Sequence, residues 1–156
     1  MRKTYIISIA FFLLISCADY DVVIRNGMIY DGTGEKPYSG DVAINNDKII
    51  KVSKSINGKG KKEINASGLA VSPGFINMLS WATTSLIKDG RSLSDIKQGV
   101  TLEVFGEGWS MGPLNEKMKE QQQTEAEGFE IDWNSLGQYL ESLERRGVST
   151  NVASFL

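Results

Sequence analysis

A change in hydrophobic pattern near Pro73 is the feature that most constrains how this 156-residue chain can fold. Before Pro73, short runs of β-branched and aromatic residues are separated by turns, and Asn26-Gly27 lies between two of these runs. Asn-Gly is the strongest two-residue hairpin signal, so we expect a hairpin there. The expected strands are residues 22–24, 28–30, 41–44 and 48–52. The pattern over residues 17–72 therefore predicts an antiparallel sheet, part of a small β-sandwich that these strands are too few to close.

After position 72 the pattern becomes an alternation of strands and helices. The expected strands are residues 75–79, 100–105 and 151–156, and the expected helices are residues 84–98, 113–123 and 134–146. This alternation is typical of an α/β fold with a parallel sheet or a (β/α)8 (TIM) barrel. A barrel needs about 250 residues, which residues 73–156 do not supply. We expect the first units of an incomplete barrel in a longer polypeptide, and open apolar strand edges that leave this length of chain inactive and poorly soluble.

The start of the chain is organised like a secretion signal. Two basic residues precede an apolar run at residues 5–15, which is too short to span a bilayer and fits the core of a signal peptide. The run ends in Leu14-Ile15-Ser16-Cys17, which resembles the lipobox of bacterial lipoproteins. We predict a signal peptide at residues 1–16, lipidation of Cys17, and a lipid anchor in the bacterial cell envelope, periplasmic or at the surface. An ordinary secretory leader that contains a cysteine is the alternative.

Composition excludes several kinds of site. The chain contains no histidine and a single cysteine. It therefore cannot form a Ser-His-Asp triad, a histidine zinc site or a Cys-x-x-Cys redox motif from its own residues. With 17 basic and 19 acidic residues the net charge is −2, whereas nucleic-acid-binding domains are usually strongly basic. We expect no nucleic-acid partner.

Residues 108–112 match the pattern Gly-x-Ser-x-Gly between an expected strand and an expected helix, as in the nucleophile elbow of α/β-hydrolases. That chemistry needs a base to activate Ser110, and the chain has no histidine. The helix of an elbow also starts directly behind the serine, whereas Met111-Gly112-Pro113 intervene here. We favour a chance match in a glycine-rich loop.

Glu103 lies inside an expected strand. Its side chain either points into the barrel or is a carboxylate that faces solvent or is paired, and we favour the second interpretation.

Three segments in order, residues 20–34, 73–77 and 98–101, resemble the amidohydrolase superfamily, and within it the N-acyl-D-amino-acid deacylase (D-aminoacylase) branch. The resemblance covers essentially all of residues 20–156. It implies an enzyme that hydrolyses carbon–nitrogen amide bonds of small N-acyl amino acids, with one or two metal ions, usually zinc. It also implies a β-sandwich built from both chain ends and a barrel whose C-terminal strand ends carry the metal.

The resemblance also identifies metal-ligand positions. The family's Asp-x-His-x-His motif on the first barrel strand falls on residues 77–81, where Asn77 replaces the aspartate and Leu79 and Trp81 replace the histidines. Neither Leu nor Trp can ligate zinc. We interpret Trp81, Trp109 and Trp133 as packing residues, with the lining of a substrate pocket as the alternative for Trp81. In the deacylase branch, a cysteine in the loop after the second barrel strand is also a metal ligand. That position falls within one residue of Glu107. Glu107 is thus our candidate metal ligand, and a carboxylate satisfied by backbone N–H groups is the alternative.

Two functions remain open. The first is the N-terminal part of a lipid-anchored deacylase, with zinc in the full-length family and none expected on this part alone. The second is a non-catalytic, membrane-anchored binding protein with a degenerate barrel site, because Leu79 and Trp81 stand where ligands are expected.

Overall fold

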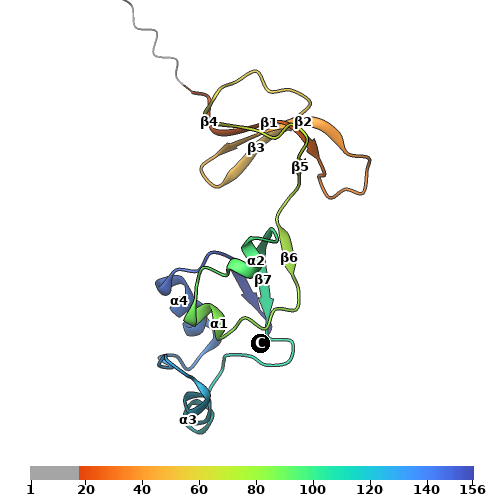
Figure 1. The fold of residues 1–156 in the computed structure, drawn as a ribbon. Coiled ribbons are helices and arrows are strands. Elements are labelled where there is room, and N and C mark those ends of the chain that lie inside the picture. Colours follow the sequence, from red (N-terminus) through yellow and green to blue (C-terminus); the bar gives the residue numbers. More distant parts are fainter. Residues whose placement is uncertain (1–17) are drawn as a thin grey trace, which may run out of the picture. The chain divides into compact units, whose positions relative to one another are not determined.

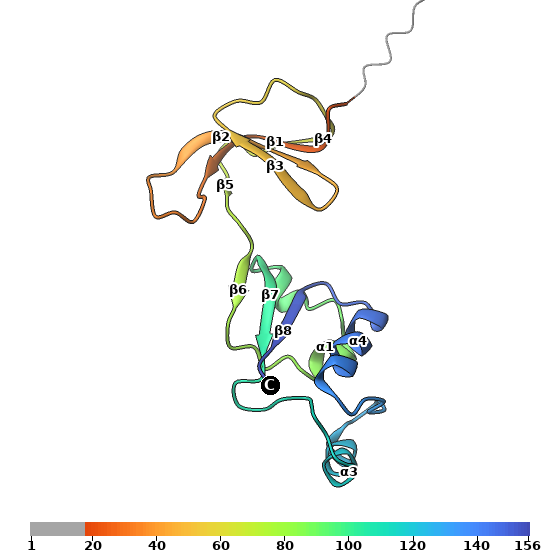
Figure 2. The same cartoon turned by 180° about the vertical axis from the view of Figure 1, so that it is seen from behind.

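The computed structural model describes residues 18–156, so the predicted signal peptide and Cys17 lie outside the described residues. The chain is α/β and forms two compact units that divide between Pro73 and Gly74. The described part of the first unit is all strand and loop, and the second contains the helices (Figures 1 and 2). Between residues 18 and 156, none of the helices has the length and apolar character needed to cross a membrane.

The first unit is a mixed five-stranded sheet. Its strands are β1 (Tyr20–Ile29), β2 (Tyr38–Asn45), β3 (Lys48–Ser53), β4 (Gly60–Asn65) and β5 (Ala70–Val71). Their order is β3-β2-β1-β4, and β5 also pairs with β1. β2 runs antiparallel to β1 and β3, whereas β4 and β5 run parallel to β1. The expectation of a purely antiparallel sheet is wrong, because the chain crosses from β3 to the other side of β1 before it forms β4.

The predicted hairpin at Asn26-Gly27 is also wrong, because β1 runs straight through this dipeptide. Its pairing with β2 shifts register between Ile24 and Gly27, and Asn26 has φ 60°. Asn adopts left-handed backbone conformations readily, and here Asn26 does so within a β-bulge. The Asn26 N–H donates to a carboxylate oxygen of Asp41 at 3.0 Å. Residues 30–37 connect β1 to β2 instead. The expected strands 41–44 and 48–52 are confirmed as parts of β2 and β3, and Asn46 in the turn between them has φ 52°.

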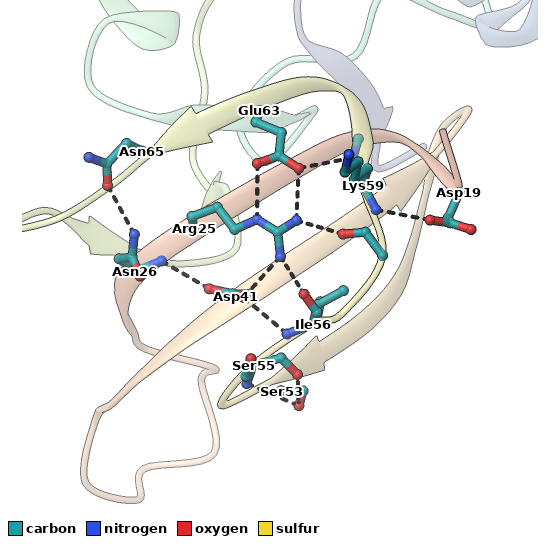
Figure 3. Close-up of polar contacts among 12 residues, drawn as sticks. Asp19, Arg25, Asn26, Asp41, Ser53, Ser55, Ile56, Lys59, Glu63 and Asn65 are labelled. Atoms are coloured by element: carbon teal, nitrogen blue, oxygen red, sulfur yellow. Dashed lines mark hydrogen bonds and ion pairs between the residues drawn. The ribbon is translucent and has the colours of Figure 1, made fainter. Parts of the chain in front are cut away.

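A half-buried arginine fixes the crossing between β3 and β4 (Figure 3). The Arg25 guanidinium on β1 donates to Glu63 on β4 at 2.8 Å and to Asp41 on β2 at 3.2 Å. It also donates to the backbone carbonyls of Ile56 and Gly58, each at 2.6 Å. The hydrogen bond from Arg25 is the main reason that the pKa of Glu63 is lowered to about 2. One side chain thus joins three strands to the crossing loop.

The second unit contains a three-stranded parallel sheet of order β6-β7-β8. Its strands are β6 (Phe75–Asn77), β7 (Val100–Phe105) and β8 (Asn151–Ser154), and its helices are α1 (Ser85–Lys88), α2 (Leu93–Ile96), α3 (Glu116–Glu125) and α4 (Leu136–Arg146). The predicted alternation is confirmed. Two helices differ from expectation: the 84–98 segment is broken between α1 and α2, where Ser92 has φ 43°, and α3 begins later, after its cap Asn115.

The core of the second unit forms around α4. Ser135 and Gln138 make a reciprocal capping box at its start, and Gly147 ends it with φ 79°. Its buried face packs on aromatic and aliphatic side chains from β7, α1 and the loop before α4 (Phe105, Leu86, Ile131, Trp133). Trp133 is a packing residue, as predicted: its ring lies 5.2 Å from that of Tyr139. Burial, and then the negative charge of Glu103, raise the pKa of Tyr139.

Candidate functional site

A cleft of about 340 Å³ opens in the second unit, where the loops that follow β6 and β7 meet. In parallel α/β sheets, ligands bind beyond the carboxyl ends of the strands, which is where this cleft lies. It brings together three residues singled out from the sequence, Leu79, Trp81 and Glu107. The remaining lining residues are Ser80, Thr83, Thr84, Gly106, Gly108, Trp109 and Glu125.

Large apolar side chains stand exposed at this cleft. Trp81 is 70% exposed, and Leu79 and Trp109 are each 51% exposed. The prediction that Trp81 and Trp109 are packing residues is therefore wrong, because both rings lie at the surface. The Trp81 ring lies against Gly108, because a Cβ built there would be 2.8 Å from a ring carbon. Exposed aromatic and aliphatic groups gathered at a cleft are typical of ligand-binding surfaces.

The candidate metal positions do not assemble a metal site. Asn77 lies at the end of β6, where its side-chain oxygen accepts the Leu79 N–H at 3.2 Å. Glu107 is exposed and makes no hydrogen bond or ion pair with residues 18–156. The alternative, in which backbone N–H groups donate to its carboxylate, is therefore wrong. No three His, Cys, Asp or Glu side chains gather within the described part of the chain. The role of Glu107 as a metal ligand stays a prediction.

A buried carboxylate lies in β7, four residues before Glu107 in the sequence. Glu103 is 0% exposed. Its carboxylate accepts hydrogen bonds from the hydroxyls of Ser80 at 2.6 Å, Ser92 at 2.9 Å and Thr150 at 3.0 Å. These hydroxyls come from the segments that follow β6, precede α2 and precede β8. Glu103 therefore ties together the segments around the sheet, and it is hydrogen-bonded rather than solvent-facing.

Ser110 is not arranged as a nucleophile. Its hydroxyl donates to the Gly112 carbonyl at 2.7 Å, and α3 begins only at Glu116. A nucleophile elbow needs a helix immediately behind the serine and a base beside it. The match to Gly-x-Ser-x-Gly is thus a turn in the loop between β7 and α3.

No protein-family model matches the chain. An N-acyl-D-aspartate deacylase from Alcaligenes xylosoxydans xylosoxydans is 31% identical over 101 residues, which is 64% of this chain and 20% of that protein. A D-aminoacylase structure concerned with a binuclear metal centre matches 88% of this chain and 29% of its own, with a TM-score of 0.66 and 25% identity. An N-acyl-D-glutamate deacylase from Bordetella bronchiseptica, complexed with zinc and a phosphonate inhibitor, matches the same shares with a TM-score of 0.75 and 22% identity.

The homologues of this chain include an N-acyl-D-aspartate deacylase and a D-aminoacylase, and its structural neighbours include D-aminoacylases, which are amidohydrolases. The resemblance inferred from the sequence is thereby confirmed. The chain spans about a fifth of the curated deacylase and under a third of the D-aminoacylase structures. It therefore corresponds to one part of such proteins.

Zinc sites need three or four ligands, and the described residues of this D-aminoacylase-like chain do not fit one. Leu79 and Trp81 have no suitable donor atom, and the Asn77 oxygen already accepts a backbone hydrogen bond. Glu107 alone presents an unpaired carboxylate at the cleft among residues 77–81 and 106–109. The cleft instead combines exposed apolar side chains with hydroxyl groups and two carboxylates, those of Glu107 and Glu125.

Proposed function

We propose that this chain is part of a hydrolase that cleaves the carbon–nitrogen amide bond of N-acyl-D-amino acids. The observation that supports this most is the agreement over 88% of the chain with a D-aminoacylase fold at 25% identity. The relative at 31% identity is an N-acyl-D-aspartate deacylase. In this proposal the three parallel strands begin a (β/α)8 barrel, and the five-stranded sheet is part of a β-sandwich.

We assign the residues of the cleft to binding and orienting the substrate. Trp81, Trp109 and Leu79 present exposed apolar surface that suits the acyl group or an apolar side chain. The Glu107 carboxylate is an acceptor for the amide N–H of the substrate. Hydrolysis adds one water across the C–N bond and releases a carboxylate and an amine. No step through a metal is assigned here, because the residues described do not fit one.

The test is hydrolysis by the intact protein of N-acetyl-D-aspartate, N-acetyl-D-glutamate and N-acetyl-D-leucine, measured as acetate and free amine. We expect release from at least one D substrate and at least a tenfold lower kcat/KM for its L enantiomer. Trp81→Ala should raise KM at least fivefold if the ring binds substrate. A folded protein that releases no amine from any of these compounds would show that the proposal is wrong.

A non-catalytic binding protein is the second candidate. Leu79 and Trp81 favour it, since they stand where the family places histidine ligands, and so does the lack of an acidic or cysteine cluster within residues 18–156. Calorimetry with N-acetyl-D-aspartate separates the two functions. Saturable binding without amine release supports the binding protein, and turnover excludes it.

We further propose that the protein is held in the bacterial cell envelope by lipid on Cys17. The support is the sequence Leu14-Ile15-Ser16-Cys17 after a basic and apolar leader. Detergent phase separation tests this. The intact protein should enter the detergent phase, and Cys17→Ser should remain in the aqueous phase. Equal partition of the two proteins would exclude the anchor.

A further inference from the structure

Four residues follow the end of β6 and lead into the wall of the cleft, and three of them have large, exposed side chains. Met78, Leu79 and Trp81 are 59%, 51% and 70% exposed, so little packing holds these side chains in place. Ser80 lies between them and is only 8% exposed. Its N–H donates to the Val104 carbonyl at 2.9 Å, which continues the contact between β6 and β7 beyond the end of β6. Ser80 is therefore the residue that fixes this segment, residues 78–81, to the sheet.

The side chain of Ser80 binds the buried carboxylate of Glu103. Its hydroxyl donates to Glu103 Oε2 at 2.6 Å and accepts the Ala82 N–H at 3.2 Å. Ser92 and Thr150 both donate to the other carboxylate oxygen, Oε1. The two oxygens thus bind different parts of the chain: Oε2 binds the segment at the cleft, and Oε1 binds the segments before α2 and β8. Hydrogen bonds from a hydroxyl to a carboxylate are short and strong, so the bond to Oε2 restrains the residues on both sides of Ser80.

We propose that Ser80 and Glu103 are positioning residues of the cleft: the hydrogen bond between them sets the position of Trp81, and thereby the affinity of the cleft for substrate. Trp81 directly follows Ser80, and its ring lies against Gly108 in the loop after β7. A shift of the Ser80 backbone therefore changes the apolar surface that the cleft presents. The effect on affinity rests on the proposed function, whereas the effect on the position of Trp81 does not.

Two matched variants separate this role from a general loss of stability. Ser80→Ala and Thr150→Val each remove one hydroxyl donor from Glu103, but only Ser80 belongs to the segment at the cleft. The intact protein is labelled with 5-fluorotryptophan, and the fluorine NMR signal of Trp81 is the one that is lost in Trp81→Phe. We expect this signal to move in Ser80→Ala and to keep its position in Thr150→Val and in Ser80→Thr, which retains the hydroxyl. A signal that does not move in Ser80→Ala, or that moves equally in Thr150→Val, would overturn the proposal.

Steady-state kinetics on the D substrate that the intact protein hydrolyses tests the effect on affinity. We expect Ser80→Ala to raise KM about fivefold with kcat changed by less than about twofold, and Thr150→Val to leave KM unchanged. If the unaltered protein binds without turnover, the Kd from calorimetry takes the place of KM. An unchanged KM or Kd in Ser80→Ala overturns the proposal even if the fluorine signal moves.

Two further outcomes are distinguishable. An unaltered protein that neither binds nor hydrolyses these compounds contradicts the proposed function, and the fluorine signal alone then decides whether Ser80 positions Trp81. If Ser80→Ala does not fold, Ser80→Cys takes its place, because a thiol is a weaker donor of similar shape. The Trp81 signal should then move in Ser80→Cys, and a signal that keeps its position contradicts the proposal.

Discussion

Both units of this chain bury a carboxylate, but they satisfy it in different ways. In the first unit, Asp41 accepts hydrogen bonds from a guanidinium and from the backbone N–H groups of Asn26 and Ile56. In the second unit, Glu103 is held by hydroxyl groups from separate segments. The first arrangement balances charge with charge, whereas the second relies on neutral dipoles in a site without solvent exposure. We therefore expect the two units to respond differently to substitution of these residues.

The largest effect should follow from Glu103→Leu, because it leaves the hydroxyls of Ser80, Ser92 and Thr150 without their acceptor. Each buried group left unpaired costs about 1–3 kcal/mol, so we expect the second unit to lose about 3–5 kcal/mol. Urea unfolding followed by tryptophan fluorescence measures this loss, since all 3 tryptophans lie in the second unit. Glu141→Leu, at an exposed position on α4, is the control and should change stability by less than about 0.5 kcal/mol. A loss below about 1 kcal/mol for Glu103→Leu would mean that the hydroxyls find other partners.

Arg25→Met should have the next largest effect, on the first unit. It removes the cation from a mostly buried Asp41 and frees the Ile56 and Gly58 carbonyls, so we expect a loss of about 2–3 kcal/mol. Asp41 keeps two backbone N–H donors, which is why the loss is smaller than for Glu103→Leu. Faster amide hydrogen exchange at Ile56 reports opening of the crossing loop.

The matched control for this variant is Arg91→Met. Arg91 also pairs with a carboxylate, that of Asp89 at 2.8 Å, but its side chain is 73% exposed. Exposed ion pairs contribute about 0–1 kcal/mol. Similar losses for the two arginine variants would show that burial does not distinguish the two ion pairs.

The sequence predicted features that depend on near neighbours. β7 and α4 were predicted within two residues of their observed bounds, because apolar periodicity, Ser135 at the start of the helix and Gly147 at its end are local signals. The hairpin predicted at Asn26-Gly27 was wrong because a β-bulge accommodates the left-handed backbone preference of this dipeptide as well as a hairpin turn does. Whether β4 pairs parallel with β1 depends on the path of the loop before it, which periodicity does not encode.

The site was predictable only in part, for the same reason. Leu79, Trp81 and Glu107 follow neighbouring parallel strands, so their meeting at one cleft follows from the βα alternation. The donors to Glu103 lie 23, 11 and 47 residues from it in sequence, and nothing in their local pattern marks them. Gln122 was likewise missed, because it lies in a polar segment and only the packed structure shows that it is buried.

Gln122→Leu should change stability in the opposite direction from the first two variants. It replaces a buried amide, which has no hydrogen-bond partner within residues 18–156, with an apolar group of similar size, so we expect the second unit to gain about 1 kcal/mol. Thermal unfolding should show a higher Tm for Gln122→Leu and an unchanged Tm for Gln121→Leu, at an exposed position on the same helix. A lower Tm would show that the amide of Gln122 is paired in solution.

The smallest expected effect is an acid-dependent loss of stability in the first unit. The pKa of Glu63 is lowered from 4.5 to about 2 in the folded chain, so its stabilisation is present above pH 4.5 and is lost as the pH falls toward 2. Burial would raise the pKa of Asp41, but hydrogen bonds from Asn26, Ile56 and Arg25 hold it below its usual value, so its contribution is lost in the same direction. Amide signals of β1 followed by NMR from pH 6 to pH 2 measure the change.

Added salt should reduce the pH-dependent loss of stability, because Glu63 is partly exposed and its ion pair is screened. Arg25→Met should flatten the part of the pH profile that Glu63 supplies, and an unchanged profile in that variant would show that Arg25 is not the main cause of the lowered pKa of Glu63.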